Sequence, residues 1–251
     1  MARIHLKTPQ EIELIRESSR ITAQTLKFLE GECLPGISTL ELDRMAETFI
    51  RDHGGTPSFK GYHGFPNSVC CSVNEEVVHG IPSSRRLKNG DVITLDTGVY
   101  KNNYHGDAAI TVAVGEVSRQ ARQLIEITRE ALYLGIDQAK PGARLGDIGF
   151  AIQTLARQYH YGVVREYTGH GIGRDLHEAP HVLHYGKANS GLRLKAGMVF
   201  TIEPMLTAGS HEIRVKKDGW TAITKDRSLC AQFEHTLALT TDGAQILTLP
   251  E

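Results

Sequence analysis

The chain has 251 residues, with 28 basic and 29 acidic side chains and a net charge of −1. A chain of this length can bury an extensive core without disulfides, and its balanced charge predicts neither a nucleic-acid-binding nor a membrane-binding surface. The sequence contains no secretory signal and no long apolar run, and its four cysteines form no CxxC pair. We therefore expect a protein of the reducing cytoplasm.

Two helices are expected in the first part of the chain. Residues 8–11 (TPQE) and 38–41 (STLE) are capping boxes, the first with proline at the first helical position. Pro35-Gly36 and Gly54-Gly55 mark the two helix ends. The inward faces should carry Ile12, Ile15, Thr22, Leu26 and Leu29 in the first helix and Leu42, Met45, Ala46, Phe49 and Ile50 in the second.

The same layout recurs about 106 residues downstream. Ser118 should cap a helix that runs to about Ala139, and a second helix should follow Pro141-Gly142. The inward face of this second helix should carry Ile148, Ala151, Ile152, Leu155 and Ala156. The segments LKNGDVITLDTG (87–98) and LKAGMVFTIEPM (194–205) also align, at an offset of 107. This pattern predicts an internal duplication of helix, helix and strands.

Strands should follow each pair of helices, and four of them should end or begin at a carboxylate. We expect strands at Ser68–Val73, Asp91–Asp96, Ala108–Val114, Val163–Thr168, Met198–Glu203 and His235–Thr240. Asp96 and Glu203 end one duplicated strand, and Asp107 and Glu234 directly precede another. The two halves, about 8–115 and 116–249, should share one antiparallel sheet with the helices outside it, in a single α+β domain spanning residues 1–251.

Four converging carboxylates need protons or cations to relieve their repulsion. Histidines in the loops favour cations, and one imidazole with four carboxylates balances two divalent ions. Such a site activates water and polarises a carbonyl. Other interpretations are weaker: a glycine-flanked histidine is often a turn residue, GHGIG lacks the remaining features of a phosphate loop, and LDTG has no second aspartic-protease loop to pair with.

Five blocks carry a resemblance to a known family: SVNEEVVHGIP (72–82), LDTGVYKNNYHGD (95–107), TGHGIGRDLHEAP (168–180), FTIEPM (200–205) and KDRSLCAQFEHT (225–236). From about Lys7 to Leu249 the chain resembles the methionine aminopeptidases of the pita-bread (creatinase/aminopeptidase) fold. The resemblance implies a curved antiparallel sheet. It also implies removal of the initiator methionine from nascent proteins when the second residue is small, by a hydroxide that two metals activate.

The resemblance also assigns roles to residues. Two divalent ions (Co, Mn, Fe or Zn) would be held by Asp96, Asp107, His170, Glu203 and Glu234. His79 would contact the scissile amide nitrogen or the substrate amine, His177 would contact the carbonyl oxygen, and Glu203 would shuttle a proton. The methionine pocket would involve Tyr62, His63, Phe65, Cys70, Leu176 and Trp220. Many members carry Tyr at Phe65 and Phe at Leu176, which leaves the shape of this pocket open, and Trp220 could equally be a packing residue on a turn.

Only 31 positions separate Glu203 from Glu234, which leaves no room for the helical insertion of the second type of the family. The chain therefore resembles the short type I enzyme, without a zinc-binding N-terminal extension. We expect a monomer that acts near the ribosome on nascent N-termini. The rivals are a prolidase or aminopeptidase P relative, and a pseudoenzyme that keeps the fold as a binding module without metals.

Overall fold

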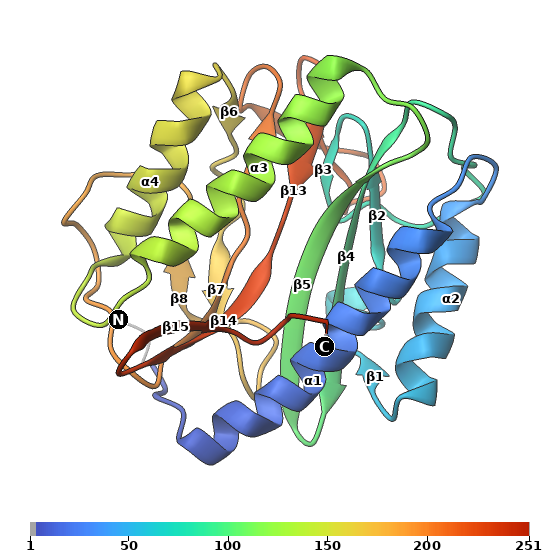
Figure 1. Ribbon diagram of the computed structural model, residues 1–251. Coiled ribbons are helices and arrows are strands. Elements are labelled where there is room, and N and C mark those ends of the chain that lie inside the picture. The colour runs from blue at the N-terminus through green and yellow to red at the C-terminus, as the bar shows by residue number, and fades with distance from the viewer. Residues whose placement is uncertain (1–3, 251) are drawn as a thin grey trace.

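In the part of the chain that the structure describes, four α-helices pack around a set of antiparallel strands (Figure 1). The computed structural model describes residues 4–250. The helices are α1 (Pro9–Glu32), α2 (Thr39–Asp52), α3 (Arg119–Gln138) and α4 (Leu145–Gln158). Within the described residues, none of them is long and apolar enough to cross a membrane.

The starts of α1, α2 and α3 are the capping sites that the sequence predicts. The Thr8 hydroxyl accepts from the backbone N–H of Glu11 at 3.3 Å, and the Glu11 carboxylate accepts from the backbone N–H of Thr8 at 2.9 Å. Ser38 and Glu41 form the same reciprocal pair at the start of α2. The Ser118 hydroxyl caps α3 by accepting from the backbone N–H of Ala121. Each cap satisfies amide groups that the first helical turn leaves free.

The expected inward face of α2 is wrong at Phe49. Its ring is only partly buried and stacks on Phe28 of α1, with ring centroids 5.1 Å apart. Asp43 is buried instead, and its carboxylate accepts from the backbone N–H groups of Ser68 and Val69 at 2.7 and 3.2 Å. These hydrogen bonds compensate for the burial of a charge, which hydrophobic periodicity alone cannot reveal.

A long hairpin forms the centre of the first part of the chain. Strand β4 (Val92–Lys101) pairs with β5 (Tyr104–Ala113) on one side and with β2 (Cys70–Val73) and β1 (Thr56–Pro57) on the other. The two expected strands were too short, because both continue to the hairpin tip. There Asn102 and Asn103 have positive φ angles of 52° and 65°, as a two-residue type I′ turn requires.

A second sheet of five strands comes from the later part of the chain. Its order is β15, β14, β9, β7, β8. The bounds are β7 (Gly169–Gly171), β8 (Glu178–Val182), β9 (Val199–Ile202), β14 (His235–Thr240) and β15 (Gly243–Ile246). The expected strand at 235–240 is confirmed, and the one at 198–203 is confirmed to within one residue at each end.

Smaller strands complete the fold. They are β3 (Glu76–Val78), β6 (Gly162–Val163), β10 (Met205–Thr207), β11 (Ile213–Val215), β12 (Ala222–Thr224) and β13 (Cys230–Gln232), in the orders β11-β12-β3 and β13-β10-β6. The expected strand Val163–Thr168 is wrong beyond Val163. Gly162 and Val163 pair with β10, and the backbone N–H of Val164 still donates to the carbonyl of Met205 at 3.1 Å. The following Arg165 and Glu166 are exposed.

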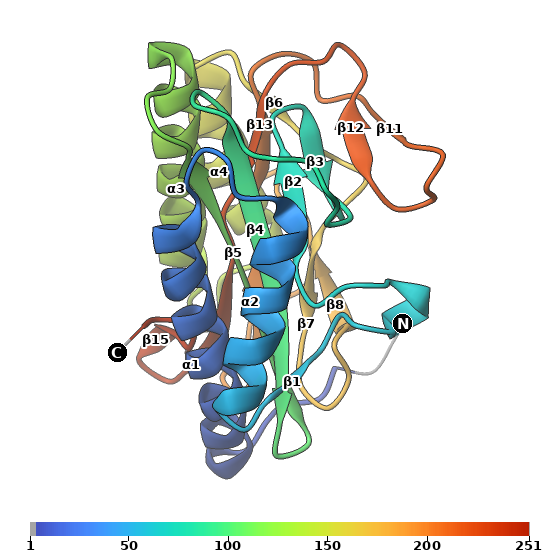
Figure 2. The same cartoon turned by 90° about the vertical axis from the view of Figure 1, so that its right-hand side faces the viewer.

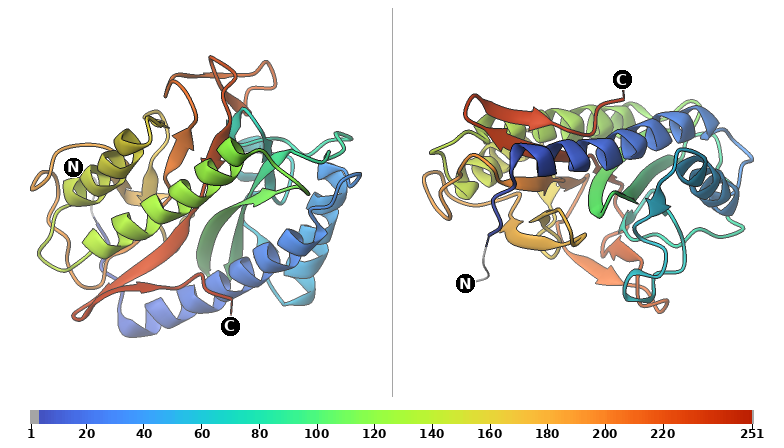
Figure 3. Two further views of the ribbon diagram at one scale, coloured as in Figure 1. Left: turned by 45° about the horizontal axis from the view of Figure 1, so that its top comes forward. Right: turned by 90° about the horizontal axis from the view of Figure 1, so that it is seen from below.

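The two large sheets meet along β5. Ala109 of β5 bridges Glu234, whose backbone N–H donates to the Ala109 carbonyl at 2.9 Å. The Thr236 hydroxyl donates to the Asp107 carbonyl at 2.7 Å. Figures 2 and 3 show α1, α3 and α4 covering one face of the strands, whereas the loops around β3, β11 and β12 project from the other. The molecule is therefore of α+β class with the pita-bread arrangement, and its open face carries the site.

Candidate metal centre and substrate pocket

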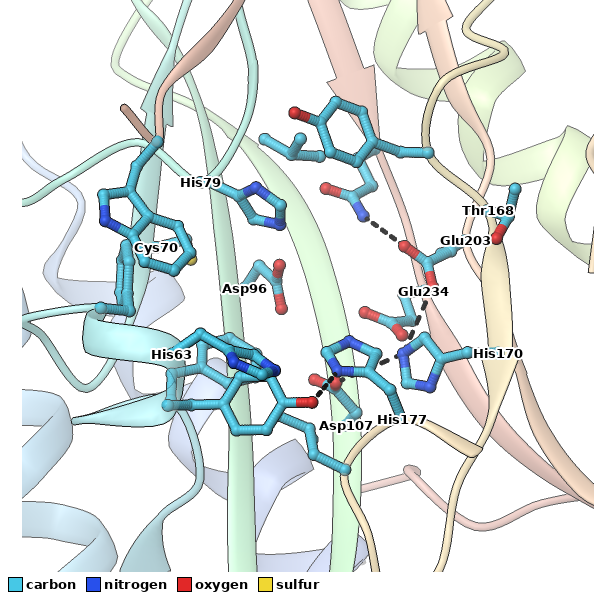
Figure 4. Close-up of a pocket in the computed structure, with 18 residues that line it drawn as sticks. His63, Cys70, His79, Asp96, Asp107, Thr168, His170, His177, Glu203 and Glu234 are labelled. Atoms are coloured by element: carbon cyan, nitrogen blue, oxygen red, sulfur yellow. Dashed lines mark hydrogen bonds and ion pairs between the residues drawn. The ribbon is translucent and has the colours of Figure 1, made fainter. Parts of the chain in front are cut away.

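One cavity of about 410 Å³ brings together every residue that the sequence nominated for the site (Figure 4). The nominated residues that line it are Tyr62, His63, Phe65, Cys70, His79, Asp96, Asp107, His170, Leu176, His177, Glu203, Trp220 and Glu234. They come from segments far apart in the chain, and the two sheets supply the acids. The cavity has an acidic end and an apolar end.

The β4–β5 hairpin positions two of the acids. Asp96 lies opposite Ala109, and Asp107 lies opposite Gly98. Asp107 precedes Ala109 by two residues, so the two carboxylates lie diagonally on the same face of the hairpin. Both acids are inside their strands, which corrects the expectation that they end or precede them. Long strands hold such side chains more rigidly than strand ends would.

The other two acids come from the second sheet. Glu234 directly precedes β14, as the sequence predicts, whereas Glu203 directly follows β9 and does not end it. The Glu203 carboxylate accepts from the Thr201 hydroxyl at 2.8 Å and from the side-chain amide of Gln232 at 3.4 Å. These two donors fix its orientation toward the cavity.

His170 contributes the imidazole, from within β7. Its Nδ1–H donates to the carbonyl of Gly171 at 3.0 Å, which leaves the Nε2 lone pair free. Nε2 lies 3.8 Å from Oδ2 of Asp107 and 3.6 Å from Oε1 of Glu203. Ligand atoms of Asp107, His170 and Glu234 all lie within 4.8 Å of one another. A backbone carbonyl that holds the opposite ring nitrogen is typical of metal-binding histidines.

The acidic end contains buried carboxyl groups without enough neighbouring positive charge or hydrogen-bond donors. Burial raises the pKa of Asp96 to about 7, and burial with the neighbouring acids raises the pKa values of Asp107, Glu203 and Glu234 well above their ordinary range. Burial lowers the pKa of His170 to about 3, so its ring is neutral. Asp96 Oδ1, Asp107 Oδ1 and Glu234 Oε1 are buried and accept no hydrogen bond. Unpaired carboxylate oxygens beside a neutral imidazole fit divalent cations.

Two further histidines face the cavity from opposite sides. His79 follows β3 in the left-handed backbone region, at φ 57°, and burial, with His177 contributing, lowers its pKa to about 4. His177 Nδ1 lies 2.8 Å from the Tyr62 hydroxyl, and its ring is 4.2 Å from that of His170. Burial also lowers the pKa of His177. Both rings are thus neutral and able to donate or accept a hydrogen bond.

The apolar end is formed by Phe65, Cys70, Leu176 and Trp220. Phe65 and Trp220 meet edge to face, with ring centroids 5.2 Å apart, and Leu176 is buried in the same cluster. Trp220 thus faces the cavity from its turn. An aromatic, aliphatic and sulfur-containing wall suits an unbranched apolar side chain.

Sequence reasoning missed several residues here. Phe59, Val78, Tyr167, Thr168 and Gln232 also line the cavity. His184 lies behind it, and its Nε2 accepts from the backbone N–H of Glu203 at 3.1 Å. The sequence carries little information about these residues, because their neighbours come from distant segments. Thr201 could have been found, since it lies two positions before Glu203 and thus on the same face of an extended chain.

The cavity combines buried carboxylates that fit divalent cations with an apolar wall that fits one side chain. In this fold, that combination indicates a metal-dependent hydrolase acting on peptides. Comparison with known proteins agrees. Residues 13–241 match the model of metallopeptidase family M24. The chain is 54% identical over 242 residues to methionine aminopeptidase 1 of Bacillus subtilis, covering 96% of this chain and 98% of that one.

Solved structures give the same result. The crystal structure of methionine aminopeptidase from Rickettsia prowazekii is 44% identical, has a TM-score of 0.96, and covers 99% of this chain and 100% of its own. The prolidase from Pyrococcus furiosus is more distant, at 26% identity and a TM-score of 0.80, and this chain covers 66% of it. The chain belongs to metallopeptidase family M24.

Proposed function

We propose that the protein is a metalloaminopeptidase that removes the initiator methionine from nascent proteins whose second residue is small. The observation that carries this proposal is a cavity in which an apolar wall lies beside the buried acids. A side chain packed against Phe65 and Trp220 would place its own peptide bond near the acidic cluster. The relative from B. subtilis, whose name states a methionine aminopeptidase, is similar over nearly the whole chain.

We further propose that Asp96, Asp107, His170, Glu203 and Glu234 hold two divalent ions, drawn from Co, Mn, Fe and Zn. The unpaired buried oxygens and the free Nε2 of His170 support this assignment. When bound, such ions activate water and polarise the scissile carbonyl.

The chain's own residues would then act on the substrate as follows. Glu203 takes and returns the proton of the attacking water, while Thr201 and Gln232 hold its carboxylate. His177 donates to the carbonyl oxygen as negative charge develops there. His79, on the opposite wall, contacts the scissile nitrogen or the free amine. The apolar wall excludes water and selects the first side chain.

The experiment compares two peptides after anaerobic purification, with metal content measured on the same sample. We expect release of methionine from Met-Ala-Ser and little release from Xaa-Pro peptides. Preference for Xaa-Pro would replace the proposal with a prolidase or aminopeptidase P activity. Protein that binds no divalent ion and gains no activity with Mn²⁺ or Co²⁺ would be a binding pseudoenzyme instead.

We also propose that the chain works as a single catalytic domain of two pseudo-twofold halves, about 8–115 and 116–249. It would act as a cytoplasmic monomer on nascent N-termini near the ribosome. The repeated order of helix, helix and strands supports the first point. Light scattering should give the mass of one chain, 27.7 kDa, and a mass of twice that value would contradict the monomer.

A further inference from the structure

The loop between β7 and β8 carries Leu176 and His177 to the cavity, and the opposite side of this loop meets the N-terminal segment. Within the cavity, the Tyr62 hydroxyl at 2.8 Å is the hydrogen-bond partner of His177 among the described residues. The position of His177 therefore depends on the contacts that the loop makes on the side away from the cavity.

Glu178, the residue after His177, holds this loop. Its Oε1 accepts from the backbone N–H of Arg174 at 2.9 Å and, more weakly, from that of Asp175 at 3.4 Å. The carboxylate thus closes residues 174–178 into a tight turn. Its other oxygen, Oε2, lies 2.5 Å from Nζ of Lys7.

The side chain of Lys7 is buried where it meets Glu178. Its side chain is 1% exposed and that of Glu178 is 16% exposed. The Lys7 backbone N–H donates to the carbonyl of Gly197 at 2.7 Å, which anchors the segment just before β9. Lysine is almost never fully buried unless it is paired, and a buried charge without its partner is strongly destabilising. The pair therefore makes a fixed link between the N-terminal segment and the loop.

The Lys7–Glu178 pair packs closely against the backbone of Gly173. A Cβ on Gly173, at the start of the loop, would lie 2.6 Å from both Glu178 Oε1 and Lys7 Nζ. A cation–π contact also holds the loop, because the guanidinium of Arg174 lies 4.8 Å from the centre of the Tyr104 ring. The Tyr104 hydroxyl donates to Glu11 in the first turn of α1 at 2.8 Å.

We propose that Lys7 and Glu178 are positioning residues for His177, and that the N-terminal segment thereby sets the catalytic geometry. Neither side chain lines the cavity, so both act through the loop. This inference rests on the proposed function, in which His177 acts on the substrate carbonyl. A displacement of about 1 Å at such a group costs roughly 100-fold in rate.

The test measures kcat and KM on Met-Ala-Ser for Lys7→Met, Lys7→Arg and Glu178→Gln. Lys27→Met serves as the control, because Lys27 pairs with Glu30 on the exposed surface of α1. We expect Lys7→Met to lower kcat roughly 10- to 100-fold with little change in KM and with full metal content. Lys7→Arg should recover part of the loss, and the control should match the wild type.

The same substitution is then made in a His177→Ala background. A residue that acts through His177 has nothing further to lose there, so Lys7→Met should leave the already reduced kcat unchanged. Equal fold-losses in both backgrounds would overturn the proposal, as would wild-type kcat in Lys7→Met. Wild-type protein that fails to release methionine would refute the proposed function instead.

Two further measurements cover other outcomes. If Lys7→Met does not fold, Lys7→Met/Glu178→Met replaces both charges with apolar side chains, which often preserves stability. A folded double variant with wild-type kcat would overturn the proposal. Amide hydrogen exchange reports on the loop without any substrate. We expect faster exchange at residues 173–178 in Lys7→Met and not in Lys27→Met, and unchanged exchange there would contradict the positioning role.

Discussion

The acidic cluster should destabilise the metal-free protein at neutral pH, and Asp96 allows this cost to be measured. Burial raises the pKa of Asp96 from its ordinary value of 3.8 to about 7. An acid whose pKa is raised by folding contributes no penalty below its unfolded pKa. The penalty then grows as the pH rises, until it levels off above the folded pKa. The shift of roughly three units corresponds to about 4 kcal/mol.

Most of this penalty falls in an accessible pH range. Between about pH 5 and about pH 8, the carboxyl of Asp96 should lower the free energy of unfolding of the metal-free protein by roughly 2.5 kcal/mol. Asp96→Asn removes this titrating carboxyl. Between about pH 5 and about pH 8, the free energy of unfolding of the variant should therefore fall by roughly 2.5 kcal/mol less than that of the wild type. The assay is urea unfolding with a chelator present. Asp137→Asn, on the exposed surface of α3, is the matched control.

Metal should reverse the effect in the wild type. Adding Mn²⁺ at about pH 8 should raise the urea midpoint of the wild type, because the ions bind the folded state, and should do so much less for Asp96→Asn. Metal-free wild type and Asp96→Asn with the same pH dependence would show that Asp96 does not carry a buried charge. The acidic cluster would then lack the electrostatic repulsion that bound cations are proposed to relieve.

Three other substitutions test separate parts of the structure. Glu203→Gln should lower kcat by a factor of about 10² to 10⁴, because it removes the proton acceptor, while circular dichroism stays unchanged; near-normal turnover would exclude the role. Trp220→Ala should raise KM for Met-Ala-Ser by roughly tenfold through loss of the aromatic wall, and an unchanged KM would mean that the side chain only packs on its turn. Ser118→Ala should cost about 1 kcal/mol in chemical denaturation, because α3 loses its cap, and identical unfolding curves would disprove that contribution.

Local signals predicted the helices well, because their causes are local. A capping box places its hydroxyl and carboxylate within four residues, so Thr8 and Ser38 marked the starts of α1 and α2 correctly. The strands were harder to predict, since pairing depends on distant partners. Residues 97–101 and 104–107 have a loop-like composition, yet each strand supplies the other's hydrogen bonds. Residues 164–168 have a strand-like composition, yet they lie outside the strands.

The site shows the same division between local and distant causes. The duplicated positions were enough to group the four acids, and the family resemblance assigned the histidines to the same cluster. The supporting contacts could not be foreseen. His184, behind Glu203, and Gln232, beside it, reach this site only because β9, β13 and the 183–184 segment pack together. Lys7 similarly meets Glu178 across a separation of 171 residues.

The register of the β4–β5 hairpin limits how this chain can change in length. Asp96 and Asp107 share one face because the two strands pair in a fixed register up to the two-residue turn at Asn102 and Asn103. A single residue inserted into either arm would turn one carboxylate to the helix side, because side chains alternate along a strand. Extra residues added at the tip leave both arms paired as before. Length variation between the two aspartates should therefore be confined to the tip, which makes it the natural place to insert a tag or label.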